Sequence, residues 1–147
     1  MLTGIHHTSI TVSDMDRSID FYRDLLGFEV IWDSRALGLA FEGPMADAVT
    51  GCPGTSQRLV FMEVCGQRLE FVQYTPTGKE QIGNKPSDTG SMHVCFLTDD
   101  IEDLHRRLAE SGAVIHCAPR HIGETMVFYF RDPDGVVLEA MGGTPIV

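Results

Sequence analysis

The sequence predicts an α+β fold in which two βαβββ modules pair into a cupped, eight-stranded mixed sheet. Three observations support this prediction. The stretch 4–27 returns in degenerate form at 92–112, and each copy contains a histidine followed seven residues later by an aspartate and ends at a glycine. Each copy also joins an alternating run to a helical pattern. Finally, each module closes on a short strand with Leu-Glu at its centre, which gives Glu70 and Glu139 matching positions.

The first module, residues 4–74, is expected to begin with a strand that leads into an amphipathic helix. Residues 5–12 alternate with a period of two, which places His7 on the face opposite Ile10 and Val12. His6 is expected on the other face, where it packs or forms hydrogen bonds.

The helix of this module is expected to start after Ser13 or Asp14 as its N-cap and to end at Gly27. Residues 42–57 are rich in glycine and proline and are expected to form a loop, either a lid over a cavity or a solvated surface loop. The expected strands of this module are residues 28–32, 58–64 and 68–74.

The second module, residues 91–142, repeats this order. His93 opens its first strand, Asp99 and Glu102 suit a capping box at the start of its helix, and Gly112 suits the end of the helix. The further expected segments are strands at 113–117, 125–130 and 136–141, a loop at 118–124, and a type I turn at Asp132-Pro-Asp-Gly135.

Composition limits the classes of function. The chain has 147 residues, of which 43% are hydrophobic, enough for one compact domain spanning 1–147 with a substantial core. A formal net charge of −10 argues against nucleic acid or an anionic membrane surface as partner. The sequence contains neither an apolar run of eighteen residues nor a signal-peptide pattern, so a cytoplasmic protein is expected. The four cysteines lack paired spacing and are expected to be free thiols.

These motifs together resemble the vicinal oxygen chelate superfamily, which includes glyoxalase I, methylmalonyl-CoA epimerase, extradiol dioxygenases and fosfomycin-resistance thiol transferases. The resemblance covers nearly the whole chain and implies the glyoxalase-like fold. The motifs that carry it are His7 with Asp14, the run Arg17-Ser-Ile-Asp-Phe-Tyr22, Leu26-Gly-Phe28, His93 with Asp100, and Phe130-Arg-Asp-Pro-Asp-Gly135 with Glu139.

The resemblance implies a metal site with four protein ligands: His7, Glu70, His93 and Glu139. An isolated strand histidine or glutamate is usually structural, but that reading does not explain why both residue types recur at the same place in both modules. Two neutral imidazoles and two carboxylates suit Zn, Ni, Co, Mn or Fe(II) and balance the charge of a divalent cation.

Such a site implies a metal-dependent lyase, isomerase or epimerase that removes a proton next to a carbonyl of a small-molecule substrate. Glu70 or Glu139 would be the catalytic base. Glyoxalase I sequences typically carry a glutathione-binding arginine where this chain has Thr11, which argues against a strict glyoxalase I. Many relatives are dimers, so a homodimer is expected.

Two alternatives remain open. An extradiol dioxygenase would bind Fe(II) through two histidines and one glutamate, and the chain resembles these enzymes at His121, Tyr129 and Glu139. Glu70 would then fill a position that those enzymes leave open, which favours the isomerase type of chemistry. A metal-free drug-binding protein, like the bleomycin-resistance relatives, would usually lack the ligand set that this chain retains.

Overall fold

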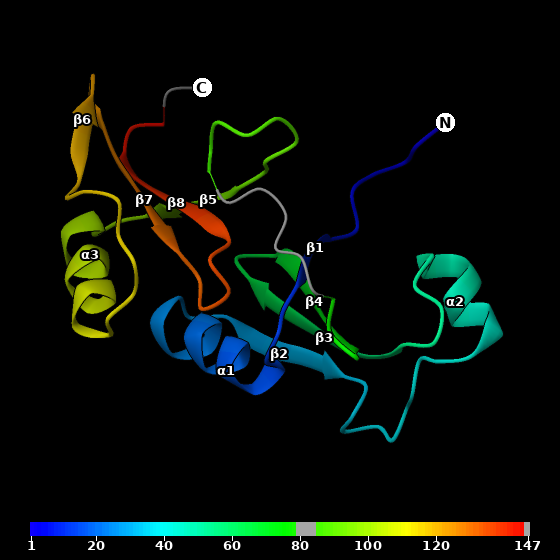
Figure 1. Ribbon diagram of the computed structural model, residues 1–147. Coiled ribbons are helices and arrows are strands. Elements are labelled where there is room, and N and C mark those ends of the chain that lie inside the picture. Colours follow the sequence, from blue (N-terminus) through cyan, green and yellow to red (C-terminus); the bar gives the residue numbers. More distant parts are fainter. Residues whose placement is uncertain (79–84, 146–147) are drawn as a thin grey trace. The chain divides into compact units, whose positions relative to one another are not determined.

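The computed structural model describes residues 1–78 and 85–145, and its contacts divide the chain into a first unit, Met1–Lys79, and a second unit, Glu80–Val147. Each unit holds one four-stranded sheet (Figure 1). The elements of the first unit are β1 (Thr8–Thr11), α1 (Met15–Asp20), the π-helical segment η1 (Phe21–Leu25), β2 (Glu29–Asp33), α2 (Pro44–Thr50), β3 (Ser56–Val64) and β4 (Gln67–Thr75). Those of the second are β5 (Val94–Thr98), α3 (Ile101–Glu110), β6 (Arg120–Ile122), β7 (Thr125–Arg131) and β8 (Val137–Gly143).

The sheet of the first unit has the order β1-β4-β3-β2, with β1 parallel to β4 and the other pairs antiparallel. Helix α1 and segment η1 cover one face of this sheet. Tyr22 of η1 is fully buried there, and its ring centroid lies 4.6 Å from that of Phe71 in β4. The buried side chains of this core include Ile10, Val12, Met15, Ile19, Val60, Met62 and Leu69. Since α1 takes one face, the other face is left for functional side chains.

The sheet of the second unit repeats this topology as β5-β8-β7-β6, with β5 parallel to β8. Helix α3 packs on it closely at one point. A β-carbon added at Gly142 of β8 would lie only 3.0 Å from the Cβ of Ile101 in α3, so glycine permits this approach. The buried side chains of this core include Leu104, Leu108, Phe128, Phe130, Leu138 and Ala140.

The predicted fold class is confirmed: two units, each with a mixed four-stranded sheet and a helix after its first strand. Gly27 and Gly112 end their helices with φ of 75° and 80°, as predicted. The turn of residues 132–135 also forms, with Gly135 donating its N–H to the Asp132 carbonyl at 3.0 Å. The joining of both sheets into one cupped sheet and the single domain of 1–147 stay predictions.

Four local predictions were wrong. Residues 44–50 form helix α2, because Pro44 occupies its first turn and Gly51 adopts the left-handed conformation at its end. Asp100, not Asp99, caps α3 by accepting from the Asp103 N–H. Residues 113–117 make only an isolated bridge to β7, and β6 forms within the expected 118–124 loop. Helix α2 stands apart from the four strands of its unit (Figure 1).

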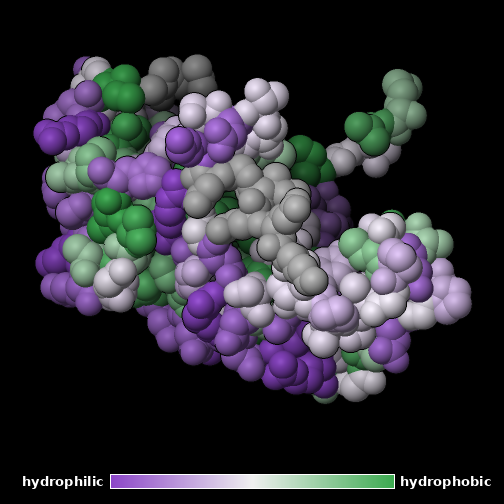
Figure 2. All heavy atoms as spheres, viewed as in Figure 1, coloured by the Kyte–Doolittle hydropathy of each residue, from purple (hydrophilic) through white to green (hydrophobic). Residues whose placement is uncertain are grey.

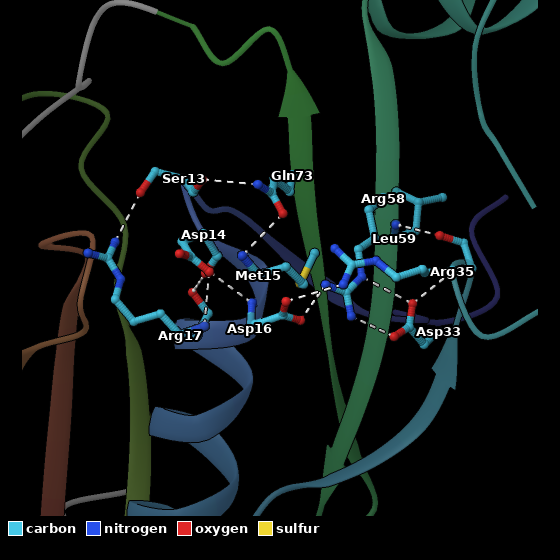
Figure 3. A network of polar contacts seen from close by, with 12 residues as sticks. Ser13, Asp14, Met15, Asp16, Arg17, Asp33, Arg35, Arg58, Leu59 and Gln73 are labelled. Atoms are coloured by element: carbon cyan, nitrogen blue, oxygen red, sulfur yellow. Dashed lines mark hydrogen bonds and ion pairs between the residues drawn. The ribbon is translucent and has the colours of Figure 1, made fainter.

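A polar network fixes the start of α1 to the sheet (Figure 3). The Asp14 carboxylate caps the helix by accepting from the N–H groups of Asp16 and Arg17. The Arg58 guanidinium of β3 donates to Asp16 at 2.5 Å and to Asp33 of β2 at 2.7 Å. Hydrogen bonds from Arg58 hold the pKa of both carboxyl groups below their usual range. The network therefore joins a helix to two strands.

The surface mixes hydrophilic and hydrophobic residues, and the first residues of the chain run out as an exposed tail with apolar side chains (Figure 2). Within residues 1–78 and 85–145, no helix combines the length and the apolar character needed to cross a membrane.

Candidate functional site

The first unit brings His7 and Glu70 together. His7 immediately precedes β1, and Glu70 lies in β4, where the parallel pairing sets Ser9 opposite Glu70. His7 comes two residues before Ser9, so its side chain projects on the same face as Glu70. His7 Nε2 lies 3.3 Å from Glu70 Oε2, and the two side chains are 33% and 17% exposed. A small ligand can therefore reach this pair.

The second unit builds the same pair from His93 and Glu139. His93 immediately precedes β5, and the parallel pairing of β5 with β8 sets Cys95 opposite Glu139. His93 comes two residues before Cys95, which repeats the offset of the first unit. Its Nε2 atom lies 3.0 Å from Glu139 Oε2, with side chains 36% and 14% exposed.

The donor atoms of each pair are spaced as neighbouring ligands of one metal ion would be. Two atoms about 2.1 Å from an ion, at a right angle to each other, are about 3 Å apart. The pairs measure 3.3 and 3.0 Å and each offers one imidazole nitrogen and one carboxylate oxygen. In the part of the chain that the structure describes, no three His, Cys, Asp or Glu side chains gather as a metal-binding group. Each unit thus provides half of the donor set that the sequence suggested.

His6 forms a hydrogen bond, as expected, but with His7 and beside Phe61, not on the face of Ile10 and Val12. Its Nδ1 atom is 2.8 Å from Nδ1 of His7, and its ring centroid is 6.1 Å from that of Phe61. The predicted face was wrong because residue 6 lies two residues ahead of Thr8, where β1 begins, so no strand pairing fixes the face of its side chain and the contact with His7 places it. One of the two Nδ1 atoms must carry the proton. When His7 is the donor, its Nε2 lone pair is free to bind a metal ion, so His6 can select the tautomer of a ligand.

A surface hollow of about 290 Å³ lies beside the first pair. It is formed by the approach to β1 and by the turn between β3 and β4. Its lining consists of Ile5, His6, His7, Thr8, Gly66, Gln67 and Arg68. The hollow gives a small polar molecule access to His7.

Proton-donating side chains surround the second pair. Tyr129 of β7 lies directly opposite Glu139, and its hydroxyl oxygen is 3.5 Å from His93 Nε2. Partial desolvation, the charge of Glu139 and a hydrogen bond to it raise the pKa of the Cys95 thiol to about 11. Desolvation and the charge of Glu139 also raise the pKa of Tyr129. Both groups therefore keep their protons at neutral pH and can donate hydrogen bonds.

His121 does not lie beside the second His-Glu pair, whereas His116 lies close to Tyr129. His121 pairs with Met126 in the register of β6 with β7, whereas Tyr129 is three residues further along β7. An odd offset on a regular strand places His121 on the face opposite Tyr129 and Glu139. His116 was missed by sequence reasoning, although its ring centroid is 6.1 Å from that of Tyr129. The alternation of residues 113–117 was the signal that could have found it.

Known proteins with similar sequences carry several activities in their names. The chain is 27% identical to glutathione transferase FosA of Serratia marcescens, over 98% of this chain and 84% of the relative. It is also 27% identical to a probable lactoylglutathione lyase of Synechocystis, over 90% of both chains. An iron-dependent extradiol dioxygenase of Rhodococcus jostii is 27% identical over 92% of this chain but only 42% of the relative.

Solved structures show the same fold. A glyoxalase family protein from Bacillus cereus superposes with a TM-score of 0.84 at 21% identity, over 99% of this chain and 97% of the other. The fosfomycin resistance protein FosX of Listeria monocytogenes, crystallised with Mn(II) and sulfate, superposes with a TM-score of 0.63 at 17% identity, over 98% of this chain and 95% of the other. A family model matches residues 4–140. The chain therefore belongs to the Glyoxalase/Bleomycin resistance protein/Dioxygenase superfamily.

Proposed function

We propose that this protein is a divalent-metal-dependent enzyme that removes a proton from the carbon next to a carbonyl of a small-molecule substrate. The lyase, isomerase and epimerase reactions predicted from the sequence all begin with this step. The observation that carries the proposal is the repeated His-Glu pair, with the same strand offset and similar spacing in both units. A structural role would not require two strand pairs to repeat the same exposed contact.

The proposed ligands are His7, Glu70, His93 and Glu139. When bound, a divalent cation acts as a Lewis acid that makes the proton beside a carbonyl more acidic. The imidazoles of His7 and His93 would stay neutral and hold the ion, while the carboxylates would balance its charge. A homodimer, as predicted from the sequence, would contain two copies of each His-Glu pair.

Either carboxylate can serve as the base, and its surroundings favour Glu70. Glu139 accepts a hydrogen bond from the Cys95 thiol, and Tyr129 lies across the strand from it. Phe61, which cannot donate a hydrogen bond, lies across the strand from Glu70. A carboxylate whose cross-strand neighbour donates no hydrogen bond keeps its oxygens available to take a proton from the substrate. In this step the C–H bond breaks, the proton passes to a Glu70 oxygen, and the electron pair moves onto the carbonyl oxygen.

Tyr129 is suited to stabilise the oxygen that gains negative charge. Its pKa is raised, so the phenol remains protonated and can donate to an enolate oxygen. The Cys95 thiol, also protonated, would hold Glu139 in place. The second pair and Tyr129 would thus hold the metal ion and stabilise the negative charge on the enolate oxygen, while Glu70 of the first pair would take the proton.

Ring cleavage by an extradiol dioxygenase is the second candidate. It is favoured by the Rhodococcus relative and by Tyr129 beside the His93–Glu139 pair. The position of His121 on the opposite face argues against the residue that this reading assigned to catalysis. The third candidate, a metal-free binding protein, predicts that the His-Glu pairs bind no metal ion.

Metal analysis of protein purified without chelator or affinity metal tests the proposal first, and about one bound divalent ion per four-ligand set is expected. Proton exchange in deuterated water is then followed by NMR with 2-oxo aldehydes mixed with thiols, acyl-CoA thioesters and hydroxy ketones. Glu70→Gln should slow exchange strongly, whereas Glu102→Gln, at an exposed position of α3, should not change it. Oxygen uptake with catechols would establish the dioxygenase instead, and protein that binds no divalent metal would overturn both enzyme readings.

A further inference from the structure

A row of aromatic rings begins at His7 and crosses the outward face of the first sheet. The Phe61 ring centroid lies 5.4 Å from that of His7, at an interplanar angle of 83°. The Trp32 ring follows at 5.9 Å from Phe61, and the Phe41 ring at 6.3 Å from Trp32. All three contacts are edge-to-face or nearly so, which is the favourable arrangement of aromatic pairs. We call Phe61, Trp32 and Phe41 the aromatic row.

The aromatic row is separate from the core of the unit. The core aromatics Tyr22, Phe28 and Phe71 are at most 2% exposed, and the Tyr22 ring of η1 packs against the other two. The three rings of the row are instead only half-buried. Phe61 pairs across the strands with Glu70, so the row lies on the face that carries the His-Glu pair.

Fixed backbone contacts hold the row in place. A register shift in β2 between Val30 and Trp32 turns Trp32 opposite Phe61. The next residue, Asp33, is tied to Arg58 on the other face. Phe41 accepts a backbone hydrogen bond from Gln57 at 2.8 Å. Rings held in this way lose little conformational entropy on binding a ligand.

The second unit has polar rings at the corresponding positions. There the row from His93 continues to Tyr129 at 5.1 Å and then to His116 at 6.1 Å. Arg131 also donates to His116 Nε2 at 3.1 Å. A surface that served only to repeat the fold would have no reason to be apolar in one unit and polar in the other.

We propose that the aromatic row is the part of the substrate site that binds a flat apolar group, and that the substrate is an aryl or similarly planar compound with its reacting oxygens beside that group. The inference rests on the proposed function for the position of those oxygens at the His-Glu pair. The Phe61 ring touches His7, so a planar group joined directly to the oxygen-bearing carbon would lie against Phe61 and Trp32.

The test compares two probes with the same metal-binding group, benzohydroxamate and acetohydroxamate, on the Zn²⁺-loaded protein by calorimetry. Because the two probes differ only in the phenyl or methyl group, the ratio of their dissociation constants gives the contribution of the planar group to binding. Phe61→Ala and Trp32→Ala should each lower the preference for the aryl probe by roughly five- to tenfold, the size of one aromatic contact. Phe61→Leu keeps an apolar side chain of similar volume and covers the case in which the alanine variant does not fold.

Phe21→Ala is the matched control, because Phe21 is a half-buried ring on η1, beside Tyr22 and away from the row. It should leave the ratio unchanged. Trp32 is the single tryptophan of the chain, so its emission reports binding at the row directly. Benzohydroxamate should change that emission, and acetohydroxamate should not.

The outcomes separate this inference from the proposed function. If both probes bind through the metal but the row variants keep the wild-type ratio, the aromatic subsite is wrong and the metal site stands. If neither probe binds the Zn²⁺-loaded protein, the metal site is wrong. Benzamide, which lacks the chelating group, then decides the subsite alone: quenching of Trp32 emission in metal-free protein that weakens in Phe61→Leu supports the row, and no quenching overturns it.

Discussion

The two His-Glu pairs are alike in construction and different in surroundings. In both units a histidine just ahead of the first strand meets a glutamate on the parallel neighbour, at 3.3 Å in the first and 3.0 Å in the second. The residue opposite the glutamate is Phe61 in one and Tyr129 in the other. The two units thus share the His-Glu pair and differ in the groups around it, so under the proposed function the two pairs would meet different parts of a substrate.

The largest expected effect comes from removing one histidine of either pair. His7→Ala and His93→Ala should each weaken metal affinity by more than the roughly 10- to 100-fold lost with an outer-shell partner. Metal content and proton exchange measure this. Mixing the two inactive variants sharpens the comparison: recovered activity means that a site takes its pairs from two copies, and no recovery means that one chain supplies both. A variant that kept its metal would show that its histidine is no ligand.

The next effect separates the two glutamates. Glu70→Gln should slow proton exchange by about 10² to 10⁴-fold, the usual contribution of a general base, while the amide oxygen can still bind metal. Glu139→Gln should lower metal affinity with a smaller loss of rate per bound ion. Rates normalised to metal content make the comparison, and equal losses at both positions would contradict the assignment of the base to Glu70.

His6 has a smaller expected effect and belongs to the first pair alone. His6→Ala removes the partner of His7 Nδ1 and should lower metal affinity about tenfold. Affinity is measured by competition with a chelator of known strength. His6→Asn, which can still accept a hydrogen bond, should restore part of the loss; if it does not, His6 has no role in fixing the tautomer of His7.

The smallest effect on function, but a clear one on stability, concerns the helices. In α1, Asp16 is bound to Arg58 of the sheet, whereas in α3 Asp103 pairs with Arg106 and Arg107 of its own helix. Arg58→Met leaves the largely buried Asp33 without this partner and should lower the free energy of unfolding by about 2 kcal/mol. Arg106→Met, at a solvent-exposed ion pair, should lower it much less. Denaturant unfolding measures both.

The loss in Arg58→Met should depend on pH. The pKa values of Asp16 and Asp33 lie below 3.8 in the folded protein, mainly through the hydrogen bonds of Arg58. Their contribution to stability is therefore full above the unfolded pKa and is lost as the pH falls through the folded pKa. The gap between variant and wild type should shrink below pH 3.8. A gap that stayed constant would show that Arg58 stabilises through packing of its stem.

The His-Glu pairs could be predicted from the sequence because both depend on short-range features that repeat. Alternation fixes the side of the sheet on which His7 and His93 lie, and the recurring Leu-Glu marks the partner strand. The parallel pairing of the first and last strands of each unit then brings the histidine and the glutamate together. The face of His6 could not be predicted because this residue lies two positions ahead of the first residue of β1, so no strand pairing fixes its side chain.

The surroundings of the pairs could not be predicted because they depend on register between strands. Phe61 faces Glu70 through the tight turn at Cys65 and Gly66, whose φ angles of 49° and 73° set the β3–β4 register. Trp32 faces the site only because the irregularity in β2 shifts its register after Val30. A one-residue shift turns every following side chain to the other face, and local sequence gives little sign of it.

The close packing of Gly142 against Ile101 has an evolutionary consequence. Gly142 lies three residues after Glu139 on β8. The contact between this glycine and Ile101 of α3 therefore sets how closely the helix approaches the strand that carries a proposed ligand. Alanine at position 142 would place its β-carbon 3.0 Å from the Cβ of residue 101, an atom that every side chain except glycine carries, so a smaller side chain at position 101 would not restore the fit. Glycine should therefore be retained at position 142 among relatives even where position 101 varies, although neither residue would meet the substrate.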